Sequence, residues 1–371
     1  MTVSIDGSNG VVFNDLTTQN TSAFYGGLAF RNRIINGAMV IDQRNAGASV
    51  TPAAATYTLD RWYAFMDVGS KFSVQQSTTA PTGFTNSMLI TSTSAYTVGA
   101  GEAYGVRQMI EGFNAADLGW GTANAQTVTL SFKVRSSLTG TFGGVLRNSA
   151  NNRTYPFTYT ISAANTFEDK SVTIAGDTSG TWLTTNGTGI GVVFGIGVGS
   201  TISGPAGAWA GTGYWGATGA TSVVGTSGAT FYITGVQLEK GSTATSFDYR
   251  PYGTELALCQ RYYFALNTAN VGSNGTYFTG VSRGTGLQGQ INPPVTMRTA
   301  PSLTSSGSGT FYVQNGAANL SPTTAATIGS TSGGNQTIFV VSGTHTAYTV
   351  GYAGQMIDQS GASFLNFSAE L

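Results

Sequence analysis

The sequence has very little charge, one cysteine and one histidine. Lys plus Arg and Asp plus Glu each number 16 in 371 residues, so 9% of the chain is charged, against roughly 25% in an average soluble domain. A neutral chain has no electrostatic footprint for nucleic acid or for an acidic membrane surface. The single Cys259 excludes an internal disulfide, and His345 as the one histidine removes most zinc sites. We therefore expect no metal, no cofactor and no nucleic-acid partner.

Long apolar runs are also absent. The first ten residues, MTVSIDGSNG, lack the basic-then-apolar order of a secretory signal. The best candidate for a membrane span is GIGVVFGIGVGSTISG at 189–204, which is interrupted by Gly, Ser and Thr. Its apolar run falls well short of the ~20 residues that a helix needs to cross a bilayer. We interpret this stretch as a buried strand with glycine bends and expect no membrane insertion.

What the sequence does contain is a series of strand patterns separated by turn residues. In TVTLSFKVRS, at 127–136, apolar and polar side chains alternate with the period of a half-buried strand. Gly, Asn, Ser and Pro clusters separate such runs at short intervals, which is typical of a sandwich or jelly roll. A brief helix is expected at TELALCQRYY, 254–263, where Leu256, Cys259 and Tyr263 share one face. The other strand-like runs cover 61–68, 71–76, 87–94, 140–147, 153–161, 170–176 and 229–240.

These patterns predict an all-β chain in three parts. Residues 1–30 form a short N-terminal docking segment, which is too small for a core of its own. Residues 31–253 form a jelly-roll β-sandwich. Residues 254–371 form a short helical connector and a second, smaller C-terminal β-sandwich module, in which no charged residue occurs between Arg298 and Asp358.

Charged residues concentrate at the two ends of the large module. Six of the 32 charges lie in 31–61 and six more in 239–261. The first and last strands of a jelly roll commonly lie side by side, and arginine suits bidentate, partly buried ion pairs. We hypothesise that the two segments meet and pair their charges, the alternative being solvated strand ends whose pairs contribute only ~0–1 kcal/mol. The residues are Arg31, Arg33, Asp42, Arg44, Asp60 and Arg61 in the first segment, and Glu239, Lys240, Asp248, Arg250, Glu255 and Arg261 in the second.

Aromatic residues in a glycine-rich stretch are the best candidates for binding. The stretch GAWAGTGYWGATGA, 207–220, contains Trp209, Tyr214 and Trp215, and Trp182 and Tyr104 are further candidates. Flat aromatic rings presented by glycine loops could stack on sugars. The alternative is that these rings cap the sandwich core or fill a subunit interface, where Trp and Tyr are also favoured.

Signatures of catalysis are weak. His345 lies in the loop-like GTHTAY, and no G-x-S-x-G elbow surrounds a serine in a strand-to-helix setting. Glycoside hydrolysis needs only two carboxylates, but the acids lie in no recognised motif. We interpret Glu168–Asp169 as a turn before a strand, and Arg107 as the partner of Glu102 or Glu111. We expect no enzymatic activity, with a polysaccharide depolymerase as the alternative.

Long motifs in the chain resemble tailed-bacteriophage virion proteins. NRIINGAMVIDQRNAG (32–47), followed by YTLDRWYAF (57–65), looks like a recurrent opening in those proteins. GVQLEKGSTATSFDYRPYGTELALCQRYYF (235–264) resembles the matching close of that module, which is similar to carbohydrate-binding jelly rolls. PPVTMRTAPSLT (293–304) and the terminal FSAEL (367–371) look like the module that follows. The chain thus resembles a virion structural protein of the tail-fibre type.

The resemblance implies a virion location and several partners. It implies a homo-oligomer, by analogy a trimer, that docks on other virion proteins through residues 1–30 and contacts the host surface, where a glycan is a candidate ligand. The same modules recur in head fibres and capsid decoration proteins, so a capsid (head) fibre is the alternative. Tail or head location, the host ligand, the docking protein and the copy number stay open at this point.

Overall fold

The structure is a computed structural model that describes most of the chain from residue 31 onward. Before residue 31 it describes three short strands, β1 (Ser4–Asp6), β2 (Gly10–Val12) and β3 (Thr18–Gln19), which pair as a small antiparallel sheet. The rest of the predicted docking segment 1–30 lies outside the described residues, and its role stays a prediction. From residue 31 the described residues are 31–267, 271–272, 274–284, 286–307, 310–315, 318–330, 337–345, 349–359 and 361–371.

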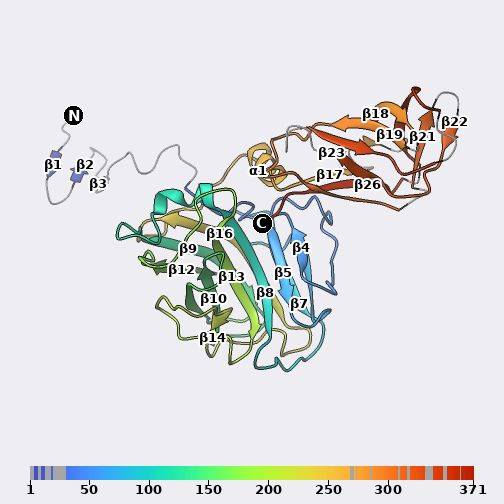
Figure 1. The fold of residues 1–371 in the computed structure, drawn as a ribbon. Helices are drawn as coiled ribbons and strands as arrows, with labels where there is room; N and C mark the ends of the chain where they lie inside the picture. The colour runs from blue at the N-terminus through green and yellow to red at the C-terminus, as the bar shows by residue number, and fades with distance from the viewer. Residues whose placement is uncertain are drawn as a thin grey trace.

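The first module is a sandwich of two antiparallel sheets (Figure 1). The six-stranded sheet has the order β11-β10-β13-β8-β5-β4, and the five-stranded sheet has the order β12-β9-β16-β7-β6. The predicted all-β sandwich of jelly-roll type is confirmed. The six-stranded sheet consists of β4 (Thr56–Leu59), β5 (Trp62–Met66), β8 (Ala103–Glu111), β10 (Gly140–Arg147), β11 (Thr154–Ile161) and β13 (Thr188–Val198). The five-stranded sheet consists of β6 (Phe72–Ser77), β7 (Ser87–Ser92), β9 (Val128–Ser136), β12 (Glu168–Ile174) and β16 (Thr230–Lys240).

Aromatic side chains fill the space between the two sheets. Successive side chains of a strand point to opposite faces, and the inward positions place Trp62, Phe132 and Phe194 together in the core. The ring of Phe194 lies 6.4 Å from that of Trp62 and 5.1 Å from that of Phe132. β13 is buried along nearly its whole length, as expected, and its pairing with β8 shifts register twice. The expected glycine bends are therefore β-bulges.

One strand and one turn differ from the expectations. The strand β8 was not among the expected strands, because its sequence lacks an alternating pattern. Both of its faces are largely buried, so apolar and polar side chains do not alternate along it. β12 begins at Glu168, so the interpretation of Glu168–Asp169 as a turn is wrong. On this edge strand Glu168 pairs with Lys170 at 2.6 Å and Asp169 with Lys133 at 2.5 Å. The two acids are thus strand residues neutralised by neighbouring lysines.

The second module is a smaller sandwich with a core of its own. A three-stranded sheet, in the order β17-β26-β20, shares one hydrophobic cluster with a seven-stranded sheet, in the order β22-β21-β25-β18-β19-β24-β23. The strands of the smaller sheet are β17 (Tyr263–Asn267), β20 (Ser302–Ser305) and β26 (Phe364–Ser368). Those of the larger sheet are β18 (Thr276–Arg283), β19 (Gly286–Ile291), β21 (Phe311–Asn315), β22 (Ala318–Leu320), β23 (Thr327–Ser330), β24 (Ile338–Val341) and β25 (Ala353–Asp358).

A single short helix, α1 (Tyr252–Gln260), lies between the two modules in the described chain (Figure 1). It starts two residues before the expected 254–263, so the predicted boundary at 253/254 falls in its first turn. Cys259 is fully buried against Ile35 and Ile41, whereas Tyr263 already belongs to β17. Among the described helices, none has the length and hydropathy that a bilayer crossing requires.

The two charged segments at the ends of the first module lie side by side. The backbone N–H of Arg33 donates to the carbonyl of Leu238 at 2.9 Å, and that of Arg31 donates to Oδ2 of Asp248 at 2.9 Å. The guanidinium of Arg250 donates to the carbonyls of Asn32 and Ile34. The hypothesis that the segments meet therefore describes the structure, and hydrogen bonds to the main chain are what join them.

The ion pairs do not connect these two segments, so that part of the hypothesis is wrong. Five of the six arginines find a carboxylate elsewhere in the tertiary structure or within their own segment, and the guanidinium of Arg31 donates to the Ser246 carbonyl instead. The remaining predicted acids, Asp42, Asp60, Glu239 and Asp248, accept hydrogen bonds from backbone N–H groups. The pairs are Arg33–Asp117, Arg44–Glu370, Arg61–Glu370, Arg250–Glu255 and Arg261–Glu111.

A buried cluster ties the end of the second module to the first, and we call it the Glu370 clamp. It comprises Arg44, Arg61, Tyr262, Tyr263 and Glu370. The Glu370 carboxylate accepts from both arginines, with Arg44 at 2.9 Å. The Arg61 guanidinium lies 3.5 Å from the Tyr262 ring centroid, and the Arg44 guanidinium lies 3.5 Å from that of Tyr263. The C-terminus consequently lies back beside the first module, as Figure 1 shows.

Candidate functional site

The predicted aromatic candidates fall into different environments. Tyr104 is fully buried at an inward position of β8, and its hydroxyl donates to Glu102 at 2.9 Å, so it cannot stack on a sugar. Trp182 is also buried, and its ring packs edge-to-face at 5.4 Å from Trp209. The Trp209 indole N–H donates to the Ala175 carbonyl at 2.8 Å. Trp182 and Trp209 therefore cap the core, which was the alternative interpretation.

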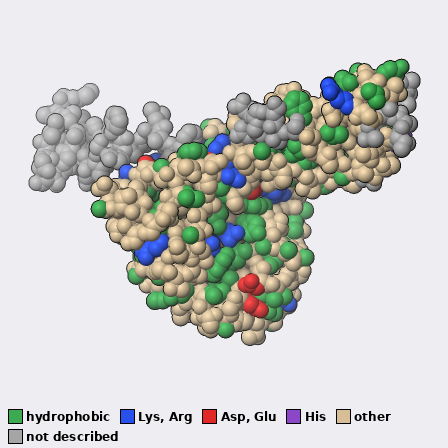
Figure 2. Space-filling model, viewed as in Figure 1, with side chains coloured by type: hydrophobic (Ala, Val, Ile, Leu, Met, Phe, Trp, Pro, Cys, Tyr) green, Lys and Arg blue, Asp and Glu red, His purple; other side chains and the backbone are tan. Residues whose placement is uncertain are grey.

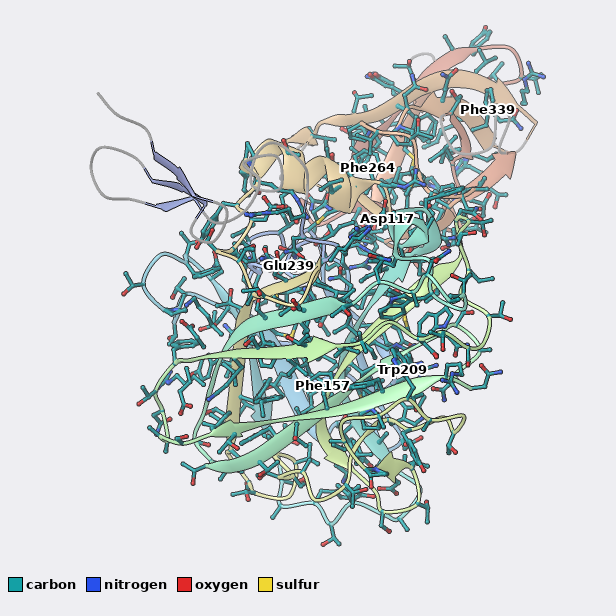
Figure 3. All side chains as sticks on the ribbon, turned by 90° about the vertical axis from the view of Figure 1, so that its left-hand side faces the viewer. Asp117, Phe157, Trp209, Glu239, Phe264 and Phe339 are labelled. Atoms are coloured by element: carbon teal, nitrogen blue, oxygen red, sulfur yellow. The ribbon has the colours of Figure 1, made fainter. Side chains whose placement is uncertain are left out.

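Figure 3 shows where this cap lies. Trp209 is on the first module, well below Asp117, which lies near the boundary with the second module. Trp120 completes the cap, with its ring 4.7 Å from that of Trp182 and 5.3 Å from that of Trp209. Tyr214 is partly exposed, and its ring covers Gly204. Trp215, the fifth candidate, lines a hollow on the outer face of the six-stranded sheet.

Arg107 does not pair with Glu102 or Glu111, so the expected structural pair is wrong. Glu111 instead accepts from Arg261 at 2.6 Å and from the Tyr262 hydroxyl at 2.6 Å. Glu102 accepts from tyrosine hydroxyls and from a backbone N–H. The reason is strand geometry: Arg107 stands on the outer face of β8, over the rings of its neighbours.

The outer face of the six-stranded sheet carries the hollow, which we call the arginine–tryptophan hollow. It has a volume of about 300 Å³. Figure 2 shows basic side chains beside a hollowed hydrophobic area over β5, β8 and β13, with acidic groups near its lower end. The residues that line it are Ala55, Tyr63, Phe65, Met66, Asp67, Gly101, Ala103, Arg107, Ile202 and Trp215.

The local sequence explains how the hollow forms. Outward positions of β5 supply Tyr63 and Phe65, and the Phe65 ring lies over Gly105, where a Cβ would come within 2.5 Å of Cζ. Trp215 comes from a covering segment that closes by parallel pairing of β14 (Ser203–Gly204) with β15 (Gly216–Ala217). The backbone N–H of Trp215 donates to the Ile202 carbonyl at 2.8 Å. Gly105 thus leaves room for the Phe65 ring at the base of the hollow. The short β14–β15 pairing holds the Trp215 indole above it.

Two arginines approach the same indole ring. The guanidinium carbon of Arg147 lies 4.4 Å from the Trp215 ring centroid, and that of Arg107 lies 5.6 Å from it. Arg107 also lies 4.6 Å from the Tyr63 ring. The stem of Arg147 lies beside Gly191, where a Cβ would be 3.0 Å from its Cγ. Glycine at this position therefore makes room for the arginine.

The surroundings of both arginines lower the pKa of their guanidinium groups. Burial lowers the pKa of Arg107. Burial, and then repulsion from Arg107, lowers the pKa of Arg147 to about 10. Neither forms an ion pair within the described residues. Both remain cations at neutral pH, in a site that desolvates them.

Sequence reasoning missed Arg107, Arg147, Tyr63 and Phe65 as members of one site. Tyr63 and Phe65 alternate with buried residues along β5, but that pattern occurs in many strands and does not point to a ligand. No described group of three or more His, Cys, Asp and Glu side chains is placed to hold a metal ion. The chemistry that this arrangement offers is stacking on aromatic rings and hydrogen bonding from guanidinium groups.

Comparisons with known proteins show that the chain is similar in fold to several solved structures. No protein-family model and no curated protein matches the chain. The enzymatically active domain of bacteriophage CBA120 tailspike protein 4 has a TM-score of 0.28 and 12% identity, covering 57% of this chain and 21% of that one. The xylan-binding CBM22-1 domain of Xyn10C from Paenibacillus barcinonensis has a TM-score of 0.27 and 11% identity, covering 54% of this chain and 99% of that one.

A third structure is similar to the same extent. The family 11 carbohydrate-binding module of Lic26A-Cel5E from Clostridium thermocellum has a TM-score of 0.27 and 13% identity, covering 54% of this chain and 99% of the module. The chain thus spans about a fifth of the length of the tailspike structure and nearly all of the two binding modules. At these TM-scores the similarities carry no argument about function.

Proposed function

We propose that this chain is a structural protein of a tailed-phage virion, a non-enzymatic, tail-fibre-type appendage that binds a host-surface glycan in the arginine–tryptophan hollow. The observation that carries the glycan part is the hollow itself. It offers partly exposed Tyr63 and Trp215 rings beside a guanidinium within about 300 Å³, at the lower end of the volumes of small-molecule sites. Apolar walls with a few fixed polar groups suit a sugar, which has both apolar faces and hydroxyls.

The motifs that resemble virion proteins coincide with the frame of the molecule. Residues 32–47 and 235–264 contain the two segments that close the first module, and 367–371 contains Glu370 of the clamp. Arg107, Arg147 and Trp215 lie outside those motifs. Tyr63 and Phe65 lie inside the motif at 57–65, so the motifs supply the frame and part of the wall of the hollow. This arrangement supports an appendage in which a shared frame positions the two modules and the residues between the motifs add the arginines and the tryptophan of the site.

The lining of the hollow supports binding in preference to hydrolysis. Its one carboxylate among the described residues is Asp67, which accepts from the backbone N–H of Ala103 at 2.6 Å. Hydrolysis of a glycosidic bond by the common mechanism uses two carboxylates on either side of the bond. Incubation of the purified chain with host polysaccharide, followed by a reducing-end assay, is expected to release no new ends.

Trp215→Ala is expected to reduce binding of the purified chain to host cells about tenfold or more, because truncating a central aromatic anchor typically costs ~2 kcal/mol or more. Trp209→Ala is the matched control, since it removes the same side chain from the core cap and leaves the hollow intact. Binding of fluorescently labelled protein measures the effect, and circular dichroism reports the fold. Equal binding by folded Trp215→Ala and wild-type protein would contradict the proposed glycan site.

The virion part of the proposal has a direct test. Gold-labelled antibody raised against the chain is expected to mark the tail of assembled particles in electron micrographs. Label on the capsid would make the chain a head fibre instead, and particles without label would exclude a virion role.

A further inference from the structure

Two arginines of the first module lie against the same tryptophan ring without an ion pair among the described residues. Arg33, Arg44, Arg61, Arg153, Arg250 and Arg261 each pair with a carboxylate. Arg107 and Arg147 pair with none among the described residues. Arg147 is 7% exposed, and both its Nε and its Nη1 are buried without a hydrogen-bond partner. The Nε of Arg107 is also buried without a partner, as it is in several of the ion-paired arginines.

Leaving these donors unpaired is energetically unfavourable. A buried cation without a counter-charge loses its hydration and gains nothing equivalent in return. Stacking on Trp215 and Tyr63 offsets part of this loss, because a ring face attracts a cation. The two positive charges also repel each other, which is one cause of the lowered pKa of Arg147. A negatively charged group in the hollow would offset this repulsion and supply the counter-charge that the two guanidinium groups lack.

The charge of the site therefore discriminates between ligands. A neutral sugar could stack on Trp215 but would leave the guanidinium groups without a counter-ion. A carboxylate presents two acceptor oxygens in the plane that matches the fork of an arginine. Asp67 does not serve as this counter-ion, since it binds the Ala103 N–H and forms no ion pair.

We infer that the arginine–tryptophan hollow binds an acidic saccharide, whose carboxylate accepts hydrogen bonds from Arg107, next to the buried positive charge of Arg147, while a sugar ring lies against Trp215. The inference rests on the proposed glycan-binding function and adds the class of sugar. The observations favour a saccharide over the acidic side chain of another protein, because the charged donors are combined with partly exposed rings in a compact hollow.

The experiment measures binding of matched acidic and neutral saccharides to the full chain by calorimetry. The pairs are sialyllactose and lactose, tetragalacturonate and its methyl ester, and a hyaluronan tetrasaccharide and its carboxyl-reduced form. We expect at least one acidic member to bind about tenfold or more tightly than its neutral partner, as charge-assisted hydrogen bonds do. The preference should weaken with added salt.

Variants assign the preference to the two arginines. Arg147→Gln and Arg107→Gln are each expected to remove most of the preference for the acidic member and to leave affinity for the neutral member nearly unchanged. Arg135→Gln is the matched control: Arg135 also stacks on a ring, at 4.7 Å from Tyr232, but on the five-stranded sheet. If Arg147→Gln does not fold, the more exposed Arg107→Gln carries the test.

The outcomes separate the inference from the proposed function. Equal affinity for acidic and neutral saccharides would overturn the inference while leaving a glycan site in place. Acid preference that survives both arginine substitutions would also overturn it. If no saccharide on a broad array of bacterial surface glycans binds, the proposed glycan function fails and the inference fails with it. Tighter binding of a poly-glutamate peptide than of any saccharide would assign the site to a protein partner instead.

Discussion

Replacing Glu370 by alanine is expected to lower the free energy of unfolding by about 3–5 kcal/mol, the cost typical of removing one partner from a buried ion pair. The Glu370 side chain is 5% exposed and accepts hydrogen bonds from Arg44 and Arg61, and Arg61 is fully buried. Without the carboxylate, both guanidinium groups keep their positions over Tyr262 and Tyr263 but lose their counter-charge. The loss concerns both modules, because Glu370 ends the second and the arginines belong to the first.

Urea denaturation followed by tryptophan fluorescence measures this effect. The control is Asp169→Asn, which breaks the Lys133–Asp169 pair on the outer face of β12, where Asp169 is 78% exposed. Exposed pairs contribute only ~0–1 kcal/mol, so the control should behave almost as wild type. Glu370→Gln keeps the shape of the side chain and removes its charge, and it should fall between the two. A loss below about 1 kcal/mol in Glu370→Ala would show that the clamp does not hold the modules together.

A second large effect is expected on the pH dependence of stability, through Asp60. Burial raises the pKa of this carboxyl to about 6, although the nearby Arg44 acts in the opposite direction. The unfolded chain has a pKa of ~3.9 for the same group. Between these values the folded protein binds the proton more tightly, so this group adds stability as the pH falls from about 7 to about 4. The shift of about two units corresponds to about 3 kcal/mol.

The test compares wild type with Asp60→Asn over this pH range. The asparagine cannot titrate, so the difference between the two free energies of unfolding should change by about 3 kcal/mol between pH 7 and pH 4. Carboxyls whose pKa is lowered, such as those of Glu111 and Asp117, contribute stability that the folded protein loses in acid. Both proteins contain these groups, so their effect cancels in the comparison. Parallel stability curves for the two proteins would rule out a buried, titrating Asp60.

Local patterns were sufficient to predict most of the strands and the division into two β modules. Alternation in 127–136 and the apolar run in 229–240 reflect which face of a strand is buried, and this is written into neighbouring residues. β8 escaped detection because both its faces are covered, one by the core and the other by the segment that carries Trp215. A strand with two buried faces has no period of two to detect.

The charge-rich segments show where such patterns stop being informative. Their unusual density indicated correctly that they would meet. The partners could not be deduced, because Arg61 and Glu370 are 309 positions apart and local sequence holds no record of that contact. The same holds for the aromatic candidates. Local sequence does not distinguish Tyr104 from Trp215 as a possible binding residue, yet Tyr104 lies in the core and Trp215 lies above the sheet.

The sequence by itself determined the all-β class, the two modules, the short helix between them and the net neutrality of the chain, since each follows from composition or from a period of a few residues. Tertiary structure alone decided which arginines are compensated. Electrostatic pairing depends on distances of a few ångströms between residues from distant strands. Arg44 and Arg61 therefore became part of a structural clamp, whereas Arg107 and Arg147 lie against aromatic rings with no carboxylate partner among the described residues.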